Sequence, residues 1–117
     1  NRYRDLALAE LDSLADAIGD PARRPGALAA LPVLLKRVAL AAWPRGQVAG
    51  LSGEAWWRFL DGNASRGALG KAQGARLDCL SYAREPAAGL SVKEARGLAK
   101  AVRAWIRRHR GPENMGR

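Results

Sequence analysis

The residue types that usually carry catalysis are scarce in this chain. His109 is its only histidine and Cys79 its only cysteine, so no His–His or His–Cys metal constellation can be built. His109 stands at the end of a predicted helix, where the helix dipole favours an imidazolium, which indicates a capping or surface position. Cys79 lies between Leu77 and Leu80, which favours a small buried thiol over a nucleophile. We therefore expect no metal and no cofactor.

Two carboxylates, Glu54 and Asp61, lie two turns apart on one predicted helix, roughly 10 Å along its axis. That distance is compatible with acid–base chemistry, but no other feature supports it. Asp61 is expected instead to pair with Arg37 or Arg45 and to fix the corner between the two central helices. The glycines between residues 62 and 74 are not followed by G-K-[ST] or preceded by a strand, so they do not form a phosphate loop. The chain is predicted not to be an enzyme.

A basic ridge is predicted along the outer face of the last helix. Its members lie opposite the apolar stripe of that helix: Lys93, Arg96, Lys100, Arg103 and Arg107. The ridge is a candidate anion-binding surface, but it lacks the interleaved aromatic residues that would stack bases. The pattern favours a solvated face over a nucleic-acid groove, and nucleic-acid binding is the alternative hypothesis.

Trp57 is the candidate for contact with a protein partner. It lies about 100° around its helix from Trp56, at the border of the apolar face, with Arg58 beyond it. Two adjacent indoles cannot both point into one core, so Trp57 is expected to be half exposed. Exposed tryptophan beside arginine is typical of interface hot spots, although a position at the edge of the core explains Trp57 equally well. The candidate partner surface consists of Arg45, Trp57 and Arg58.

These residues are positioned by two helices joined at a proline-forced corner. Trp43 precedes Pro44, and a residue before proline is pushed away from helical φ/ψ, so the first helix should stop there. Ser52 is expected to cap the second helix, with Leu51 packing on Trp56 as a hydrophobic staple. The aromatic residues of this stretch and of the last helix predict a structural core that contains Trp43, Trp56, Phe59, Leu60 and Trp105.

Apolar residues at three- and four-residue spacing predict helices along most of the chain. We expect them over residues 2–18, 27–43, 52–61 and 72–83, with a single turn near 45–49 and a last helix that opens with an S-x-x-E capping box at Ser91 and Glu94. Pro32 either kinks the second helix or lies in the first turn of a helix that begins near Leu31. Lys36 and Arg37 leave the apolar stripe and are expected to reach solvent or a carboxylate.

The fold class follows from this pattern. No segment alternates in the manner of a strand, so we predict an all-α, compact single-domain bundle of five to six helices over residues 1–111, followed by a disordered tail over 112–117. At 117 residues, one domain buries roughly 65% of its unfolded surface without disulfides. No unbroken run reaches the ~20 apolar residues of a membrane span.

The chain is strongly basic, with a formal net charge of +9 and a pI near 11.0. A field of that sign attracts phosphates, anionic lipids or acidic proteins without choosing among them. Arginine greatly outnumbers lysine and alanine is abundant, as GC-rich coding alone would produce. The charge therefore does not by itself indicate nucleic acid, and the single cysteine is compatible with a reducing compartment.

A set of short motifs resembles a known family. They are basic-basic-x-Ala-Leu at residues 36–40, Pro-Arg at 44–45, Leu-Ser-Gly-Glu-x-Trp at 51–56 and Phe-Leu-Asp at 59–61, with weaker echoes at 1–4, 82–84 and 105–109. The chain thereby resembles a bacterial domain-of-unknown-function family encoded beside MoxR-type AAA+ ATPases and von Willebrand factor A proteins. Most of the motif residues are of structural types.

The resemblance implies a location and partners. Members of the family carry one transmembrane helix just upstream, which would place this domain on the cytoplasmic side of a bacterial inner membrane. Arg2 and Arg4 would then be juxtamembrane positive charges, although the residues alone fit an exposed basic helix start. The chain has no initiator methionine and begins within a helical pattern, which suggests a piece of a longer protein. The implied role is accessory to the ATPase and the von Willebrand factor A proteins.

Overall fold

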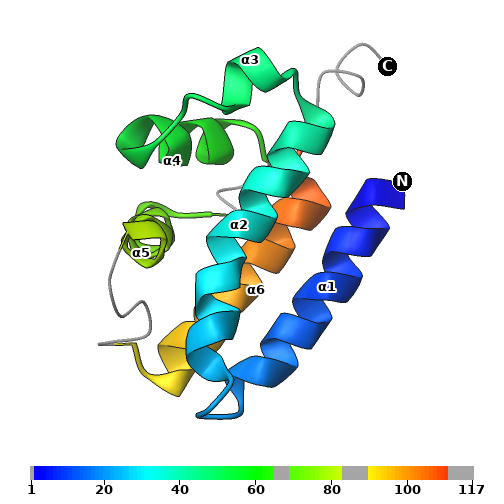
Figure 1. The fold of residues 1–117 in the computed structure, drawn as a ribbon. Helices are drawn as coiled ribbons and strands as arrows, with labels where there is room; N and C mark the ends of the chain where they lie inside the picture. The colour runs from blue at the N-terminus through cyan, green and yellow to red at the C-terminus, as the bar shows by residue number, and fades with distance from the viewer. Residues whose placement is uncertain (1, 65–68, 83–89, 111–117) are drawn as a thin grey trace.

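A computed structural model describes residues 2–64, 69–82 and 90–110 of the chain. Within these ranges the fold consists of helices and contains no β-strand (Figure 1). The helices are α1 (Arg2–Ile18), α2 (Arg24–Ala42), α3 (Arg45–Val48), α4 (Gly53–Gly62), α5 (Lys71–Tyr82) and α6 (Val92–Arg108). The all-α prediction is therefore confirmed. The predicted tail at 112–117 lies outside the described residues.

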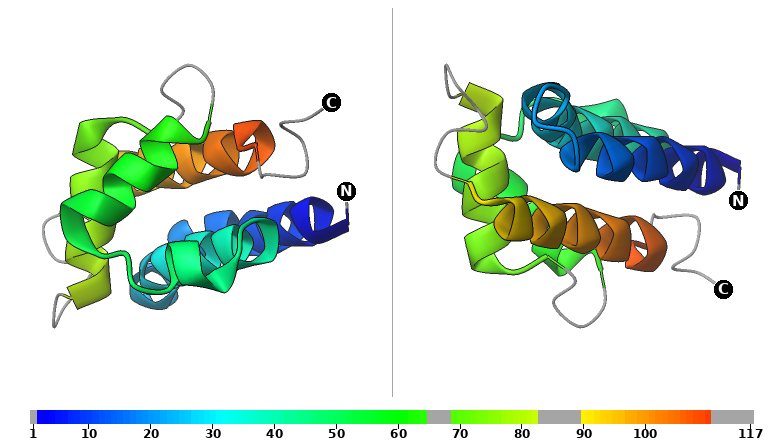
Figure 2. Two further views of the ribbon diagram at one scale, coloured as in Figure 1. Left: turned by 90° about the horizontal axis from the view of Figure 1, so that it is seen from above. Right: turned by 90° about the horizontal axis from the view of Figure 1, so that it is seen from below.

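The long helices α1, α2 and α6 run along one another, and α4 and α5 pack across one side of them (Figure 1). Figure 2 shows the same arrangement from above and from below. The helix α1 contacts α2 and α6, whereas α5 contacts α2, α4 and α6. The α4–α5 layer is therefore held to the bundle mainly through α5 and through side chains that reach α4 from α6 and α2.

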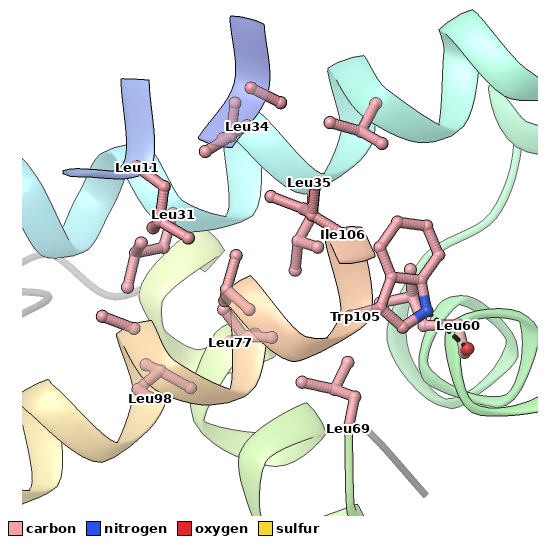
Figure 3. Close-up of a cluster of buried hydrophobic side chains, with 14 of the residues drawn as sticks. Leu11, Leu31, Leu34, Leu35, Leu60, Leu69, Leu77, Leu98, Trp105 and Ile106 are labelled. Atoms are coloured by element: carbon pink, nitrogen blue, oxygen red, sulfur yellow. Dashed lines mark hydrogen bonds between the residues drawn. The ribbon is translucent and has the colours of Figure 1, made fainter. Parts of the chain in front are cut away.

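The core lies where α1, α2 and α6 meet and extends toward α4 and α5 through Leu60, Leu69 and Leu77 (Figure 3). On α6 the buried side chains recur at three- and four-residue spacing, as an amphipathic helix requires: Ala95, Leu98, Ala99, Val102, Trp105 and Ile106. Of the five residues assigned to the core, Trp43, Trp56, Leu60 and Trp105 are buried. Phe59 is half-buried, and its ring lies edge-on to Trp43 at 5.0 Å and stacks on Trp56 at 5.8 Å between centroids.

The helix α2 begins earlier than the sequence pattern indicated. It starts at Arg24 with Pro25 in its first turn and runs through Pro32, which is buried inside the helix. The hypothesis that Pro32 opens the helix is therefore wrong, because Pro25 occupies the first-turn position that tolerates proline. By length and composition α2 would also satisfy a test for a membrane span, but half of it is buried in the bundle, as expected of a core helix.

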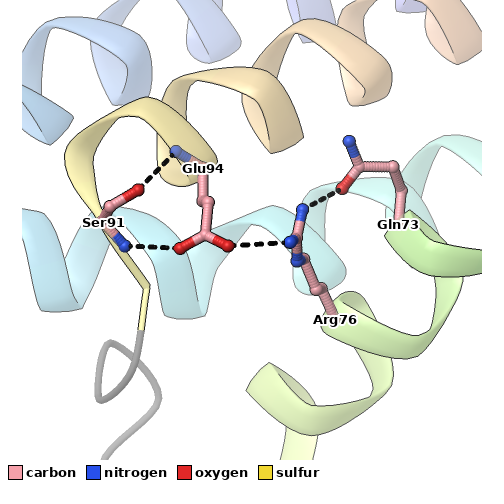
Figure 4. A network of polar contacts seen from close by, with 4 residues as sticks. All are labelled: Gln73, Arg76, Ser91 and Glu94. Atoms are coloured by element: carbon pink, nitrogen blue, oxygen red, sulfur yellow. Dashed lines mark hydrogen bonds and ion pairs between the residues drawn. The ribbon is translucent and has the colours of Figure 1, made fainter.

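Two predicted helix caps have different outcomes. Ser52 precedes α4 in an extended conformation, but its side chain accepts no hydrogen bond from the helix, and the next residue, Gly53, has a φ of 55°. The predicted Ser52 cap is therefore wrong, because the chain enters α4 through a left-handed glycine. Ser91 and Glu94 do form the predicted capping box, with hydrogen bonds of 3.0 and 2.9 Å, and Arg76 of α5 joins Glu94 at 2.9 Å (Figure 4).

The Glu94 carboxylate is expected to make stability depend on pH. Hydrogen bonds from the Ser91 backbone and side chain, with the charge of Arg76, hold the pKa of Glu94 below its ordinary value near 4.5. The stabilisation is therefore complete above that value and disappears as the pH falls through the lower pKa of the folded state. Glu94→Gln should lower the thermal midpoint at pH 7, and this difference should shrink at pH 3. An equal difference at both pH values would contradict this account.

Candidate functional site

Trp57 is half-buried and forms part of the contact between α4 and α5. Its indole nitrogen donates a hydrogen bond of 3.0 Å to the Gly70 carbonyl, just before α5. The ring lies directly against Gly74, where a methyl group would come 1.5 Å from Trp57 Cδ1. The side chain is thus fixed in orientation by α5 and keeps an exposed part. The structure shows the contact at the edge of the core, and contact with a partner stays a prediction.

The two arginines of the predicted partner surface lie on either side of this tryptophan in sequence but are not equivalent. Arg58 is exposed and pairs with Glu54, four residues earlier on α4, at 2.7 Å, with about 70% of each side chain accessible. Ion pairs as exposed as this contribute only ~0.2–1 kcal/mol to stability. A carboxylate of a partner could therefore take the place of Glu54 beside Arg58 with little loss of stability. Arg45 is exposed at the start of α3 and forms no ion pair within the described ranges.

A pocket of about 290 Å³ opens between α4 and α5 beside Trp57. It is lined by Gly53, Glu54, Trp57, Gly74, Ala75 and Asp78. The sequence did not predict this pocket, because its two walls come from α4 and α5. The sequence between these helices shows no hydrophobic periodicity that would indicate how they pack. The only available signal was a glycine inside α5, where an indole could approach the backbone closely.

Lys36 has a structural role that the sequence did not predict. Its ammonium nitrogen lies 4.1 Å from the centroid of the Trp56 ring and donates to the carbonyls of Leu51 and Val48 at 2.8 and 3.5 Å. Burial lowers its pKa from the ordinary value. Lys36 therefore joins α2 to the connection before α4, whereas it was expected to reach solvent or a carboxylate.

Asp61 does not form the ion pair that was predicted for it. Arg37 pairs with Glu10 of α1 at 2.7 Å, and neither it nor Arg45 pairs with Asp61 in the described part of the chain. The reason is that α1, rather than α4, packs along the face of α2 that carries Arg37. The expectation that Arg37 would reach a carboxylate is confirmed, with a different carboxylate.

His109 is the C-cap residue of α6 and is almost completely buried, with 1% of its surface exposed. Its Nε2 lies 2.7 Å from the Tyr3 hydroxyl and its Nδ1 2.7 Å from the Ile106 carbonyl. The ring stacks on Trp105 at 4.8 Å between centroids. The prediction of a surface position for His109 is therefore wrong, because the start of α1 and the Trp105 indole cover the imidazole ring.

The motifs at the two ends of the chain fold together around this histidine. Arg4 donates hydrogen bonds to the carbonyls of Ile106, Arg107 and His109 at 2.9, 2.7 and 3.1 Å. These are carbonyls at the end of α6 that lack helical partners. Arg4 thus caps α6, and no local sequence pattern indicates this cap, because the two segments lie at opposite ends of the chain.

Cys79 is exposed, in contrast to the buried thiol that was predicted. Leu77 and Leu80 are both buried and lie three residues apart on one face of α5, so the position between them turns toward solvent. Within the described residues no group of three or more His, Cys, Asp or Glu side chains converges to hold a metal ion.

The basic ridge of α6 is largely solvent-exposed. Lys93, Arg96, Lys100 and Arg107 are exposed, whereas Arg103 is less so and pairs with Asp12 of α1. A groove of about 200 Å³ between α1 and α6 is bordered by Arg96, Lys100 and Arg103 over an apolar floor. None of the described residues that line this groove is aromatic.

Most of the chain matches the model of one protein family. The model of a domain of unknown function (DUF4381) matches residues 1–108. No match to the chain was found among curated proteins or solved structures.

Proposed function

The chain belongs to the DUF4381 family, and we propose that it is a non-enzymatic protein-interaction domain accessory to a MoxR-type AAA+ ATPase and von Willebrand factor A proteins. The proposal extends to a tether in the bacterial inner membrane, with this domain on the cytoplasmic side. The motifs between residues 36 and 61, which resemble the family encoded beside those proteins, support the choice of partners.

The observation that carries the proposal is the fixed, half-exposed Trp57 beside the exposed Arg58 on α4. Tryptophan and arginine are the residue types most enriched among interface hot spots. Because the indole is already held by Gly70 and Gly74, binding would order few additional groups, and this lowers the entropic cost of association.

The proposed tether concerns the start of α1. Arg2 is exposed at the start of α1 and is suited to a juxtamembrane position. Arg4 has a structural role instead, because its guanidinium is held by the end of α6. Within α1, Arg2 is therefore the residue whose positive charge we propose to favour the cytoplasmic side of the membrane.

A pull-down with the neighbouring ATPase and von Willebrand factor A proteins tests the proposal. Arg58→Glu should reduce retention of at least one partner about tenfold, because it reverses a charge at the proposed contact while removing only a weak surface ion pair. Trp57→Ala should do the same, although it also removes packing on Gly74. Arg107→Glu, an equal charge reversal on the α6 ridge, should retain the partners. If the wild-type domain retains neither partner, the proposal is wrong.

The alternative function is nucleic-acid binding through the α6 ridge, and the observation in its favour is the run of exposed cations along one helix. Binding of this kind loses affinity steeply with salt, with a log–log slope of several units. Duplex and single-stranded DNA titrated at 50 and 200 mM salt would show such a slope, reduced by Lys100→Ala and unchanged by Arg58→Glu. Binding without this salt dependence would exclude the alternative.

A further inference from the structure

The pocket between α4 and α5 has an acidic and aromatic lining on a chain whose net charge is +9. Glu54 and Trp57 line it from α4 and Asp78 lines it from α5, while the other described residues of its lining have no side chain larger than a methyl group. Its volume of about 290 Å³ is at the lower limit of the ~300–1,000 Å³ of small-molecule sites. The pocket is therefore suited to a single long side chain rather than to a large cofactor.

Among the described side chains, the charges around the pocket are incompletely balanced. Glu54 pairs with Arg58, but both side chains are about 70% exposed, so this pair is easily exchanged. Asp78 has no cation within ion-pair distance among the described side chains. A positively charged group that entered the pocket would thus meet one carboxylate from each wall and the indole between them.

The chain already contains one interaction of this kind within its own fold. The Lys36 ammonium lies over the Trp56 ring, and carbonyl oxygens accept its hydrogen bonds. Trp57 offers a second indole, which is held by its hydrogen bond to Gly70 and its contact with Gly74. A guanidinium fits this second site better than an ammonium, because it is planar, stacks on indole rings and donates to two carboxylates at once.

We propose that this pocket receives an arginine side chain of the protein partner, stacked on Trp57 between Glu54 and Asp78. The inference rests on the proposed function, in which the α4 face contacts a protein, and adds the chemistry that the partner must present: an arginine on an exposed segment. Arg58 competes for Glu54 in the free domain, so its removal should strengthen binding of an isolated arginine derivative, whereas the whole partner also loses its own contact with Arg58.

Single blocked amino acids test the pocket without the partner. The probes are acetylated and amidated arginine and the same derivative of citrulline, which has nearly the same shape without the charge. They are titrated at constant ionic strength into the ¹⁵N-labelled domain, and the Trp57 indole N–H signal is identified from its loss in Trp57→Phe. Arginine should move this signal with half-saturation in the millimolar range, and citrulline should not.

Variants locate the binding site. Asp78→Asn and Glu54→Gln should each raise the half-saturating arginine concentration about threefold, as expected for one partly exposed charge pair, and Arg58→Ala should lower it about twofold. Asp61→Asn, on the same helix but outside the pocket, should leave it unchanged. An equal response to citrulline, or an equal effect of Asp61→Asn and Asp78→Asn, would overturn the proposal.

Other outcomes separate the pocket from the proposed function. If the partners are retained in the pull-down but arginine leaves the Trp57 signal unmoved, the pocket proposal alone is wrong. If arginine binds as predicted but no partner is retained, the proposed function is wrong. A Trp57 signal that moves with protein concentration alone would identify a second copy of this chain as the occupant, and would overturn the assignment to a partner.

Discussion

Replacing Gly74 by alanine is expected to lower the free energy of unfolding by about 2 kcal/mol, although alanine is the better helix former by about 1 kcal/mol. The added methyl group would lie 1.5 Å from Trp57 Cδ1 and 2.3 Å from Nε1. Both atoms belong to the five-membered ring of the indole, which is held in place by the hydrogen bond from Nε1 to the Gly70 carbonyl. Overpacking of this kind costs ~1–3 kcal/mol, and here the overlap is large enough to exceed the gain in helix propensity.

The effect of the Gly74 substitution should reverse in sign when Trp57 is removed. In a Trp57→Ala background the methyl group meets no indole, so Gly74→Ala should raise the free energy of unfolding by up to about 1 kcal/mol. The resulting coupling of about 3 kcal/mol is large for a double-mutant cycle. Urea denaturation of the four proteins measures it. The same destabilisation in both backgrounds would show that Trp57 does not lie against Gly74.

Gly97 is the matched control for Gly74. It also lies inside a helix, α6, but a methyl group there would meet nothing within 4 Å. Gly97→Ala should therefore stabilise the domain by up to about 1 kcal/mol. A loss of stability at Gly97 would mean that substitution of helical glycine is harmful in this fold for a reason other than Trp57.

Replacing Trp105 by alanine is expected to be the most damaging single change, at about 4 kcal/mol. Trp105 is completely buried, stacks on His109 at 4.8 Å and donates a 2.6 Å hydrogen bond to the Leu60 carbonyl (Figure 3). Its hydrogen bond thus joins α6 to α4. Against a total stability of ~5–15 kcal/mol, this loss is enough to leave a fraction of the domain unfolded at 37 °C.

Graded variants at Trp105 separate its two contributions. Trp105→Phe keeps a ring in the core but removes the donor to Leu60, whose carbonyl also accepts from Asn63 N–H at 3.3 Å. It should therefore cost only about 1–2 kcal/mol. Leu6→Ala, an apolar truncation at a position that is 62% exposed, should change stability by less than about 0.5 kcal/mol. Equal losses for Trp105→Ala and Leu6→Ala in urea denaturation would contradict the central role of Trp105.

The helices could be predicted from the sequence because their signals are local. The first helix was predicted over residues 2–18, as observed, and the capping box at Ser91 and Glu94 forms as expected. Where two local signals competed, the prediction was less accurate. The second helix was predicted to begin at residue 27, or near Leu31 with Pro32 in its first turn, whereas α2 begins at Arg24 with Pro25 in its first turn.

The features that the sequence did not predict depend on segments far apart in the chain. The burial of His109 depends on Tyr3, and the cap on α6 depends on Arg4, both at the opposite end of the chain. No pattern around His109 signals either contact. The exposure of Cys79 is different, because the i, i+3 spacing of Leu77 and Leu80 already places the intervening positions on the outer face of α5.

Only part of the candidate site could be predicted, because the rest depends on how segments far apart in the chain pack together. The helical angle between Trp56 and Trp57 indicated that only one could be buried, and the structure has Trp56 buried and Trp57 half-buried. The pocket and its second wall, formed by Gly74, Ala75 and Asp78, needed the position of α5. Tertiary packing, which periodicity does not specify, therefore determined the chemistry of the site.

The most direct test of the proposed function is an NMR titration of the ¹⁵N-labelled domain with the unlabelled MoxR-type ATPase and, separately, with the von Willebrand factor A protein. One of them should broaden or shift the Trp57 indole signal and the backbone signals of Arg58 and Asp78, while the signals of Lys100 and Arg107 on the α6 ridge should stay in place. Changes confined to the α6 ridge, or no change with either protein at saturating concentration, would contradict it.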